Sequence, residues 1–109
     1  MYGIREEIYE KIINISKKYK NYIFLLFGSR ARGNFRKNSD IDIAICGNVS
    51  DSEEVDIKNE FDMIDMEYIV DLVFIKNVKN DQLLKNIKNE GVELQWEDLR
   101  KEKWIYIKR

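Results

Sequence analysis

The chain has 109 residues, of which 44% are hydrophobic and 36% are charged. That length and apolar content suit one folded domain with its own core and exclude a disordered chain. Nineteen basic and twenty acidic residues leave a net charge of -1, which argues against a general nucleic-acid binder. A single cysteine and the lack of histidine exclude an internal disulfide, a zinc finger and a His-based triad.

The N-terminal stretch is charged and amphipathic where a signal peptide would have an apolar run. No later stretch is long enough and apolar enough to span a bilayer. We therefore expect a cytoplasmic protein that makes no contact with membrane or nucleic acid, with one domain over residues 1–109.

The first forty residues contain an amphipathic pattern, an apolar run and a basic turn. The pattern predicts a helix over about residues 3–20 that packs one face on a sheet; its apolar positions are Ile4, Ile8, Ile12, Ile15 and Tyr19. The continuous apolar run 22–27 is typical of a strand buried on both faces. Gly28 ends that strand, and the polar stretch 29–39 predicts a turn, a short helix and a loop.

Residues 40–46 alternate strictly between isoleucine and other residues, which predicts a second strand. One face of it is apolar, and the other carries Asp40 and Asp42. Ser50 followed by Glu53 has the form of a capping box and predicts the start of a second long helix.

The β-prone run 68–75 predicts a third strand, with Asp71 as the one acid in an otherwise apolar stretch. A last helix is expected over residues 81–90, with Gly91 as its C-terminal cap. Residues 92–109 form a tail that we cannot assign to a helix or strand. This order predicts an α/β or α+β fold in which helices pack on a small mixed sheet.

Three acids in two apolar strands require an explanation, because a buried carboxylate is costly unless cations or hydrogen bonds compensate it. Asp40 and Asp42 point to the same face, and Asp71 can join them if the two strands are neighbours. Such an oxygen-rich cluster suits Mg²⁺, with Mn²⁺ as a substitute. Two ions about 4 Å apart would stabilise the attacking and leaving oxygens of a displacement at phosphorus.

Gly28 and Ser29 follow a buried strand and open a basic turn. Glycine lets the backbone approach a phosphate closely, and the serine hydroxyl can donate to a phosphate oxygen. Arg30 and Arg32 can neutralise further phosphate charge. The turn is not a Walker A loop, because the Gly-Lys-Ser/Thr ending is missing.

Each part alone also has an ordinary interpretation: a strand-to-helix turn for Gly28-Ser29, a half-exposed strand edge for Asp40 and Asp42, and an ion-paired strand end for Asp71. Together they form the pattern Gly-Ser, ten residues, Asp-x-Asp and a later strand aspartate. This pattern resembles the signature of the DNA polymerase β-like nucleotidyltransferases. In length the chain is similar to their minimal members, the MNT proteins.

The resemblance implies that Gly28 and Ser29 hold a nucleoside triphosphate, expected to be ATP, and that Arg30 and Arg32 lie at often basic positions. It implies that two Mg²⁺ ions are bound by Asp40, Asp42 and Asp71, and that Asp71 helps to deprotonate the incoming hydroxyl.

Larger relatives carry a second domain that binds the acceptor, and this sequence shows none. MNT proteins resemble antitoxins whose partner is a HEPN ribonuclease toxin, so the resemblance implies AMP transfer from ATP to a tyrosine of such a toxin. Two alternatives stay open: neutralisation of the partner by binding alone, and transfer to a small molecule or an RNA end. The tail aromatics Trp96, Trp104 and Tyr106 are candidates for a partner surface or for packing on the chain's own core.

Overall fold

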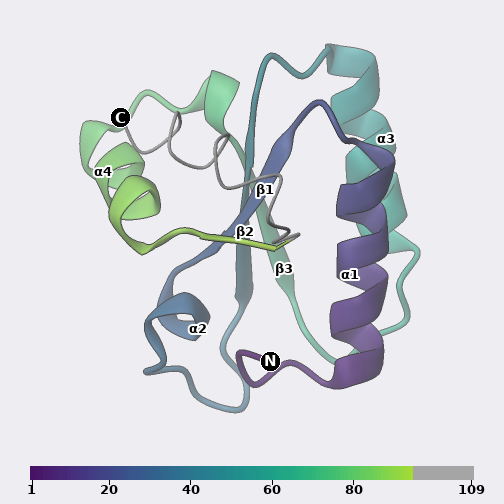
Figure 1. Cartoon of the computed structure of the whole chain (residues 1–109), viewed down its shortest axis with the longest axis vertical. Coiled ribbons are helices and arrows are strands. Elements are labelled where there is room, and N and C mark those ends of the chain that lie inside the picture. The colour runs from purple at the N-terminus through teal and green to yellow at the C-terminus, as the bar shows by residue number, and fades with distance from the viewer. Residues whose placement is uncertain (95–109) are drawn as a thin grey trace.

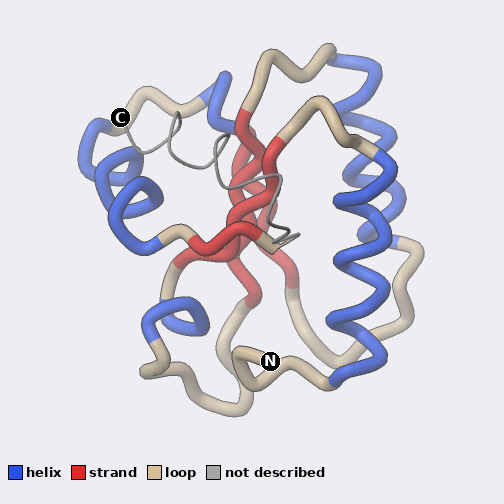
Figure 2. The backbone as a smooth tube through the Cα atoms, viewed as in Figure 1, coloured by secondary structure: helices blue, strands red, loops and turns tan. Residues whose placement is uncertain are grey.

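The computed structural model of the chain describes residues 1–94. Four strands form one sheet in the order β3-β2-β1-β4 (Figure 2). β1 (Ile23–Phe27) pairs antiparallel with β2 (Ile41–Cys46) and with the short β4 (Val92–Glu93), whereas β3 (Val70–Phe74) pairs parallel with β2. The sheet is therefore mixed, which confirms the predicted fold class.

Helices cover both faces of this sheet (Figure 1). α1 (Glu6–Lys18) and α3 (Asp51–Asp62) lie side by side on one face, and α4 (Asp81–Glu90) lies on the other. Two short elements follow strands directly: α2 (Ser29–Arg32) follows β1, and the 3-10 turn η1 (Ile75–Asn77) follows β3. No helix in the described part of the chain is long and apolar enough to cross a membrane.

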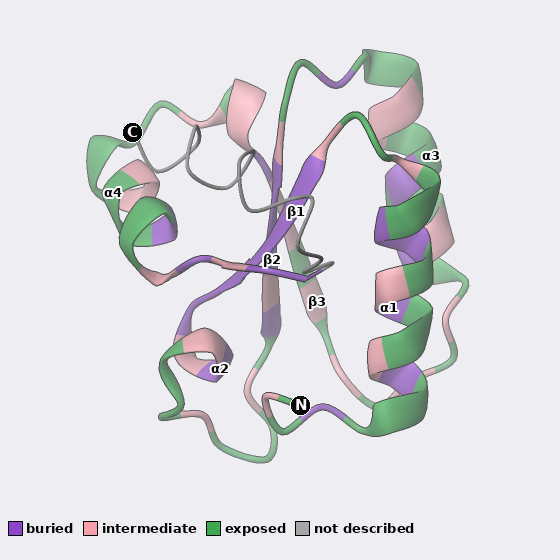
Figure 3. Cartoon of the chain, viewed as in Figure 1, coloured by how far each residue is buried: buried purple, intermediate pink, exposed green. Residues whose placement is uncertain are grey.

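The isoleucines of residues 40–46 form one apolar face, as predicted, and the other face also contributes to a second, smaller apolar cluster. Ile41, Ile43 and Ile45 are fully buried in the cluster under α1 and α3. Ala44 is buried in the smaller cluster on the α4 face, together with Ile87 of α4. Figure 3 shows β1 and β2 largely buried at the centre of the molecule and the outer helix faces exposed. At about 1.5–3 kcal/mol for each buried isoleucine, these contacts hold β2 firmly in place.

Two elements begin a few residues later than predicted, because the residues before them make other hydrogen bonds. α1 begins at Glu6 instead of residue 3, because the chain first makes a turn in which the Ile4 amide donates to the Met1 carbonyl. β3 begins at Val70 instead of residue 68; the Tyr68 hydroxyl there accepts a hydrogen bond from the Arg5 amide.

The predicted helix signals behave as expected at the other boundaries. The Ser50 hydroxyl accepts from the Glu53 amide and caps α3. α4 spans Asp81–Glu90 as predicted, and the Gly91 amide donates to the Ile87 carbonyl at its end. The proposed partner surface formed by the tail aromatics lies outside the described residues.

Candidate active site

Three segments far apart in the sequence meet at one end of the sheet. Because β1 runs antiparallel to β2, the residue after β1, Gly28, lies beside the start of β2. β3 is parallel to β2, so its first residues reach the same end. The register places Asp42 directly between Phe27 of β1 and Asp71 of β3. The fold therefore brings together the glycine turn and two of the three predicted acids.

Gly28 and Asp42 are in such close contact that only glycine fits. Gly28 has a φ of 77°, in the left-handed region that side chains rarely adopt. A Cβ atom added there would overlap the carboxylate oxygen Oδ2 of Asp42. The turn predicted to hold phosphate is thus in direct contact with a predicted metal ligand.

The carboxyl group of Asp42 is partly buried and lies near the charges of the other two acids. Partial burial raises the pKa of its carboxyl group, and the charges of Asp71 and Asp40 raise it further. Arg32 and Arg30 act in the opposite direction on the same pKa. A carboxylate surrounded by other carboxylates is stabilised by a cation, and hard oxygen donors suit Mg²⁺.

The paired carboxylates fit a metal site in their chemistry, although their side chains are not gathered around one point. Among the described residues, no three Asp, Glu, Cys or His side chains are close enough together to hold an ion. Asp42 and Asp71 are direct neighbours across the strands, and Asp40 precedes β2 on the same face.

Arg32 lies on the exposed side of α2 and pairs with an acid that the sequence analysis did not select. One of its guanidinium nitrogens, Nη1, donates to both carboxylate oxygens of Glu90, at 3.0 and 3.1 Å. The Gly28 amide also donates to Glu90, at 3.3 Å. Glu90, the last residue of α4, therefore contacts two groups predicted to bind phosphate.

Glu90 could not be found from sequence spacing, because its position depends on β4. The short strand β4 pairs with β1, with Val92 opposite Leu26, and this pairing carries the end of α4 to Gly28. The sequence shows an ordinary helix end at residue 90, and the strand after it lay in the tail that we left unassigned.

Arg30 is buried, with 1% of its surface exposed. Its guanidinium donates to the Ser39 carbonyl from Nε at 3.1 Å and from Nη2 at 2.8 Å. It also donates to the carbonyls of Tyr2 at 3.1 Å and Lys37 at 3.4 Å. These bonds use most of the donors of a guanidinium. The structure thus directs Arg30 to backbone carbonyls, whereas we expected it to contact nucleotide.

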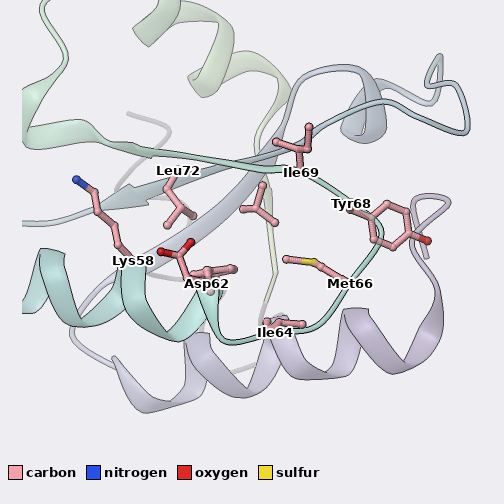
Figure 4. A pocket seen from close by; sticks show the side chains of 9 residues that line it. Lys58, Asp62, Ile64, Met66, Tyr68, Ile69 and Leu72 are labelled. Carbon is pink, nitrogen blue, oxygen red and sulfur yellow. The ribbon is translucent and has the colours of Figure 1, made fainter.

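A groove of about 450 Å³ elsewhere on the molecule does not contain the site residues (Figure 4). It lies between the end of α3, the segment that follows it and β3, and Val70 and Leu72 of β3 line it. Neighbouring residues of a strand point to opposite faces, so Asp71 points away from this groove. The acids face the side of the sheet that α4 covers.

Comparison with known proteins gives a family and a set of similar folds. The model of the family described as "Polymerase beta, Nucleotidyltransferase" matches residues 10–99. A comparison with curated proteins finds no match.

Three solved structures illustrate the likeness of fold. A toxin–antitoxin complex with AMP-PNP matches with 22% identity and a TM-score of 0.64, over 91% of this chain and 82% of its own. A MntA-HepT complex matches with 19% identity and a TM-score of 0.62, over 95% and 80%. The complex of a tri-AMPylated HEPN toxin from Shewanella oneidensis with its MNT antitoxin matches with 18% identity and a TM-score of 0.59, over 95% and 83%.

The family match covers most of the chain, including β1, α2, β2 and β3, the elements that carry the predicted site. The fold agrees with the solved structures over at least nine-tenths of the chain. This chain belongs to the polymerase β nucleotidyltransferase family.

Proposed function

We propose that the chain is an Mg²⁺-dependent antitoxin that transfers AMP from ATP to a tyrosine of a HEPN-type toxin and so inactivates it. The observation that carries the proposal is the direct pairing of Asp42 with Asp71 beside Gly28. This arrangement combines a phosphate-binding turn with a pair of metal-binding acids. The partner is inferred from the similar structures, which are described as toxin–antitoxin complexes.

In this proposal, the chain's own residues bind and orient the nucleotide. The Gly28 backbone approaches a phosphate closely, and the Ser29 hydroxyl donates a hydrogen bond to it. The Arg32 guanidinium leaves Glu90 and pairs with phosphate oxygens, because it forms charge-assisted hydrogen bonds with either anion.

Asp40, Asp42 and Asp71 would hold the metal, and Asp71 would accept the proton of the attacking tyrosine. The tyrosine oxygen bonds to the α-phosphorus of ATP as the bond to the β-phosphate oxygen breaks, and pyrophosphate leaves. When bound, Mg²⁺ neutralises the charge that develops on these oxygens.

The test is transfer of labelled AMP from ATP to a co-expressed HEPN-type partner in the presence of Mg²⁺. Wild-type protein should label the partner, and Asp42→Asn should reduce labelling by at least about 100-fold, because removal of a metal ligand costs several kcal/mol. Glu67→Gln, which removes an acid from an exposed ion pair with Arg5, should retain activity. Normal labelling by Asp42→Asn would contradict the proposal.

A second candidate is neutralisation by binding alone. The similar structures support this candidate because each is described as a toxin–antitoxin complex. Under this function, Asp42→Asn would protect cells from the toxin as well as the wild type does. Under AMP transfer, the variant would still bind the toxin but would fail to protect cells. Transfer to a small molecule or RNA end would be supported only by activity without any protein partner.

A further inference from the structure

Arg30 is the one cation of the glycine turn that lies inside the protein, and its contacts join three separate segments. Its guanidinium holds the carbonyl of Tyr2 near the N-terminus and those of Lys37 and Ser39 in the loop before β2. The ring centroids of Phe35 and Tyr68 lie 5.2 and 5.1 Å from the guanidinium carbon. Tyr68 belongs to the segment that leads into β3.

Two of these contacts adjoin the predicted metal ligands in the chain. Ser39, whose carbonyl accepts two of the guanidinium bonds, is the residue directly before Asp40. Tyr68 precedes Asp71 by three residues, and the amide of Ile41 donates to the Ile69 carbonyl next to it. Arg30 therefore fixes the backbone on which two of the acids stand.

The loop before Asp40 is held at its start by the Ser29 carbonyl, which accepts from the Gly33 and Asn34 amides, and by Phe35, whose ring packs against Gly3. Residues 33–38 have no helix or strand assignment, and most of them are exposed. Nearer to Asp40, besides the Arg30 contacts, the Arg36 amide donates to the Ser39 hydroxyl and the Ser39 amide donates to the Arg36 carbonyl. Asp40 itself is exposed and lies just before β2, between the loop and the paired residue Ile41.

We propose that Arg30 is a positioning residue for the metal site: it orders the loop through the Ser39 carbonyl and so holds Asp40 next to Asp42. It does not contact the nucleotide. This assignment rests on the proposed metal-dependent function, and it replaces the nucleotide-binding role that we expected from the sequence.

The test measures Mn²⁺ binding to the nucleotide-free protein by electron paramagnetic resonance of the free ion. Arg30→Lys keeps the charge but cannot donate two parallel bonds to Ser39 while also reaching Tyr2. It should raise the Mn²⁺ dissociation constant by roughly 10-fold, the lower end of the range for residues that orient metal ligands. Phe35→Leu loosens the packing on the guanidinium and leaves its hydrogen bonds in place, so it should raise this constant by a smaller factor, about 3-fold.

Ile12→Val controls for a general loss of stability, because Ile12 is fully buried in the core and is not one of the residues that contact the Arg30 guanidinium. This variant should melt at a lower temperature without a change in Mn²⁺ affinity. If Arg30→Lys and Phe35→Leu both bind Mn²⁺ like the wild type, Arg30 does not position the site. The same conclusion follows if Ile12→Val weakens Mn²⁺ binding as much as they do.

The measurement also separates this assignment from the proposed function. If wild-type protein does not bind Mn²⁺, the metal-dependent function and the role of Arg30 both fail. If wild-type protein binds Mn²⁺ and the Arg30 and Phe35 variants bind it equally well, only the role of Arg30 fails. Should Arg30→Lys not fold, Phe35→Leu decides alone.

Discussion

Helix α2 carries an arginine on each of two sides, and the two arginines differ in burial: the one on the inner side is buried and the one on the outer side is exposed. On the inner side, Arg30 is buried between two aromatic rings and donates to backbone carbonyls. On the outer side, Arg32 is exposed and pairs with the carboxylate of Glu90. An arginine that donates to backbone carbonyls stays in place, whereas an exposed arginine that pairs with a carboxylate can exchange it for a phosphate. We therefore expect replacement of Arg30 to reduce mainly the stability of the protein and replacement of Arg32 to weaken mainly ligand binding.

The largest difference should be seen in stability. Arg30→Met should lower the free energy of unfolding by about 2–4 kcal/mol, because buried carbonyls lose their charged donor. Arg32→Met should change it by no more than about 0.5 kcal/mol, since its ion pair is exposed to solvent. Urea unfolding measures both values. If the two variants lose the same free energy of unfolding, the inner arginine stabilises the fold no more than the outer one does.

Gly28 lies directly before α2, and its replacement should cause the next largest loss of stability. Gly28→Ala should cost about 2–3 kcal/mol, because a left-handed backbone and an overlap with Asp42 both oppose the new methyl group. Gly33 provides the matched control. It has a φ of 89° but no atom within 4 Å of an added Cβ. Gly33→Ala should therefore cost only about 1 kcal/mol, and a cost equal to that of Gly28→Ala would argue against the steric contact with Asp42.

The outer side should influence ligand binding more than stability. Arg32→Gln should weaken ATP binding by about 5- to 10-fold, equivalent to roughly 1 kcal/mol for a lost charge-assisted contact. Isothermal titration calorimetry with a non-hydrolysable ATP analogue measures this change. The control is Arg5→Gln, which removes an exposed arginine that pairs with Glu67. If both variants bind the analogue as the wild type does, Arg32 has no part in nucleotide binding.

The smallest effect is expected from the charge on Asp42. Its pKa is raised in the folded protein, so the native state holds a proton that the unfolded chain has already released. Its contribution to stability therefore falls as the pH rises from the ordinary carboxyl range through the raised pKa. Asp42→Asn removes the charge and with it this loss of stability. The variant should therefore have a thermal midpoint a few degrees higher at pH 7, which corresponds to a gain of less than about 1 kcal/mol in the free energy of unfolding.

The comparison with wild type must be made across pH, because other acids titrate in the same range in both proteins. The gap between the two thermal midpoints should widen from pH 4 to pH 7. A constant gap would indicate that the amide acts through packing instead of charge. Together with the loss of activity expected for this variant, a higher midpoint would show that the site costs stability.

Much of the fold follows from patterns within single elements. The alternation in β2 and the spacing of isoleucines in α1 identify faces correctly, because burial imposes a period of two on strands and 3.6 on helices. The Gly28 turn and the three aspartates were likewise selected by local chemistry. The sequence alone does not show that β3 pairs with β2. Only the register of the folded sheet places Asp71 beside Asp42.

The parts that sequence reasoning missed depend on contacts across the chain. Nothing in the basic run around Arg30 distinguishes a buried guanidinium from an exposed one, since burial is decided by Tyr2, Phe35 and Tyr68. Glu90 reaches the site only because β4 returns beside β1.

The contact between Gly28 and Asp42 has a consequence for local motion. Asp42 pairs with Phe27, the residue before Gly28, so the turn and the acid belong to adjacent hydrogen-bonded strands at the centre of the sheet. They can separate only if β1 and β2 part, which requires the core to open. Amide hydrogens in the central parts of β1 and β2 should exchange with solvent only through global unfolding, while those of the loop before Asp40 should exchange through small local openings. We therefore expect the two halves of the candidate site to open by different routes, and the half that opens locally is the one that Arg30 contacts.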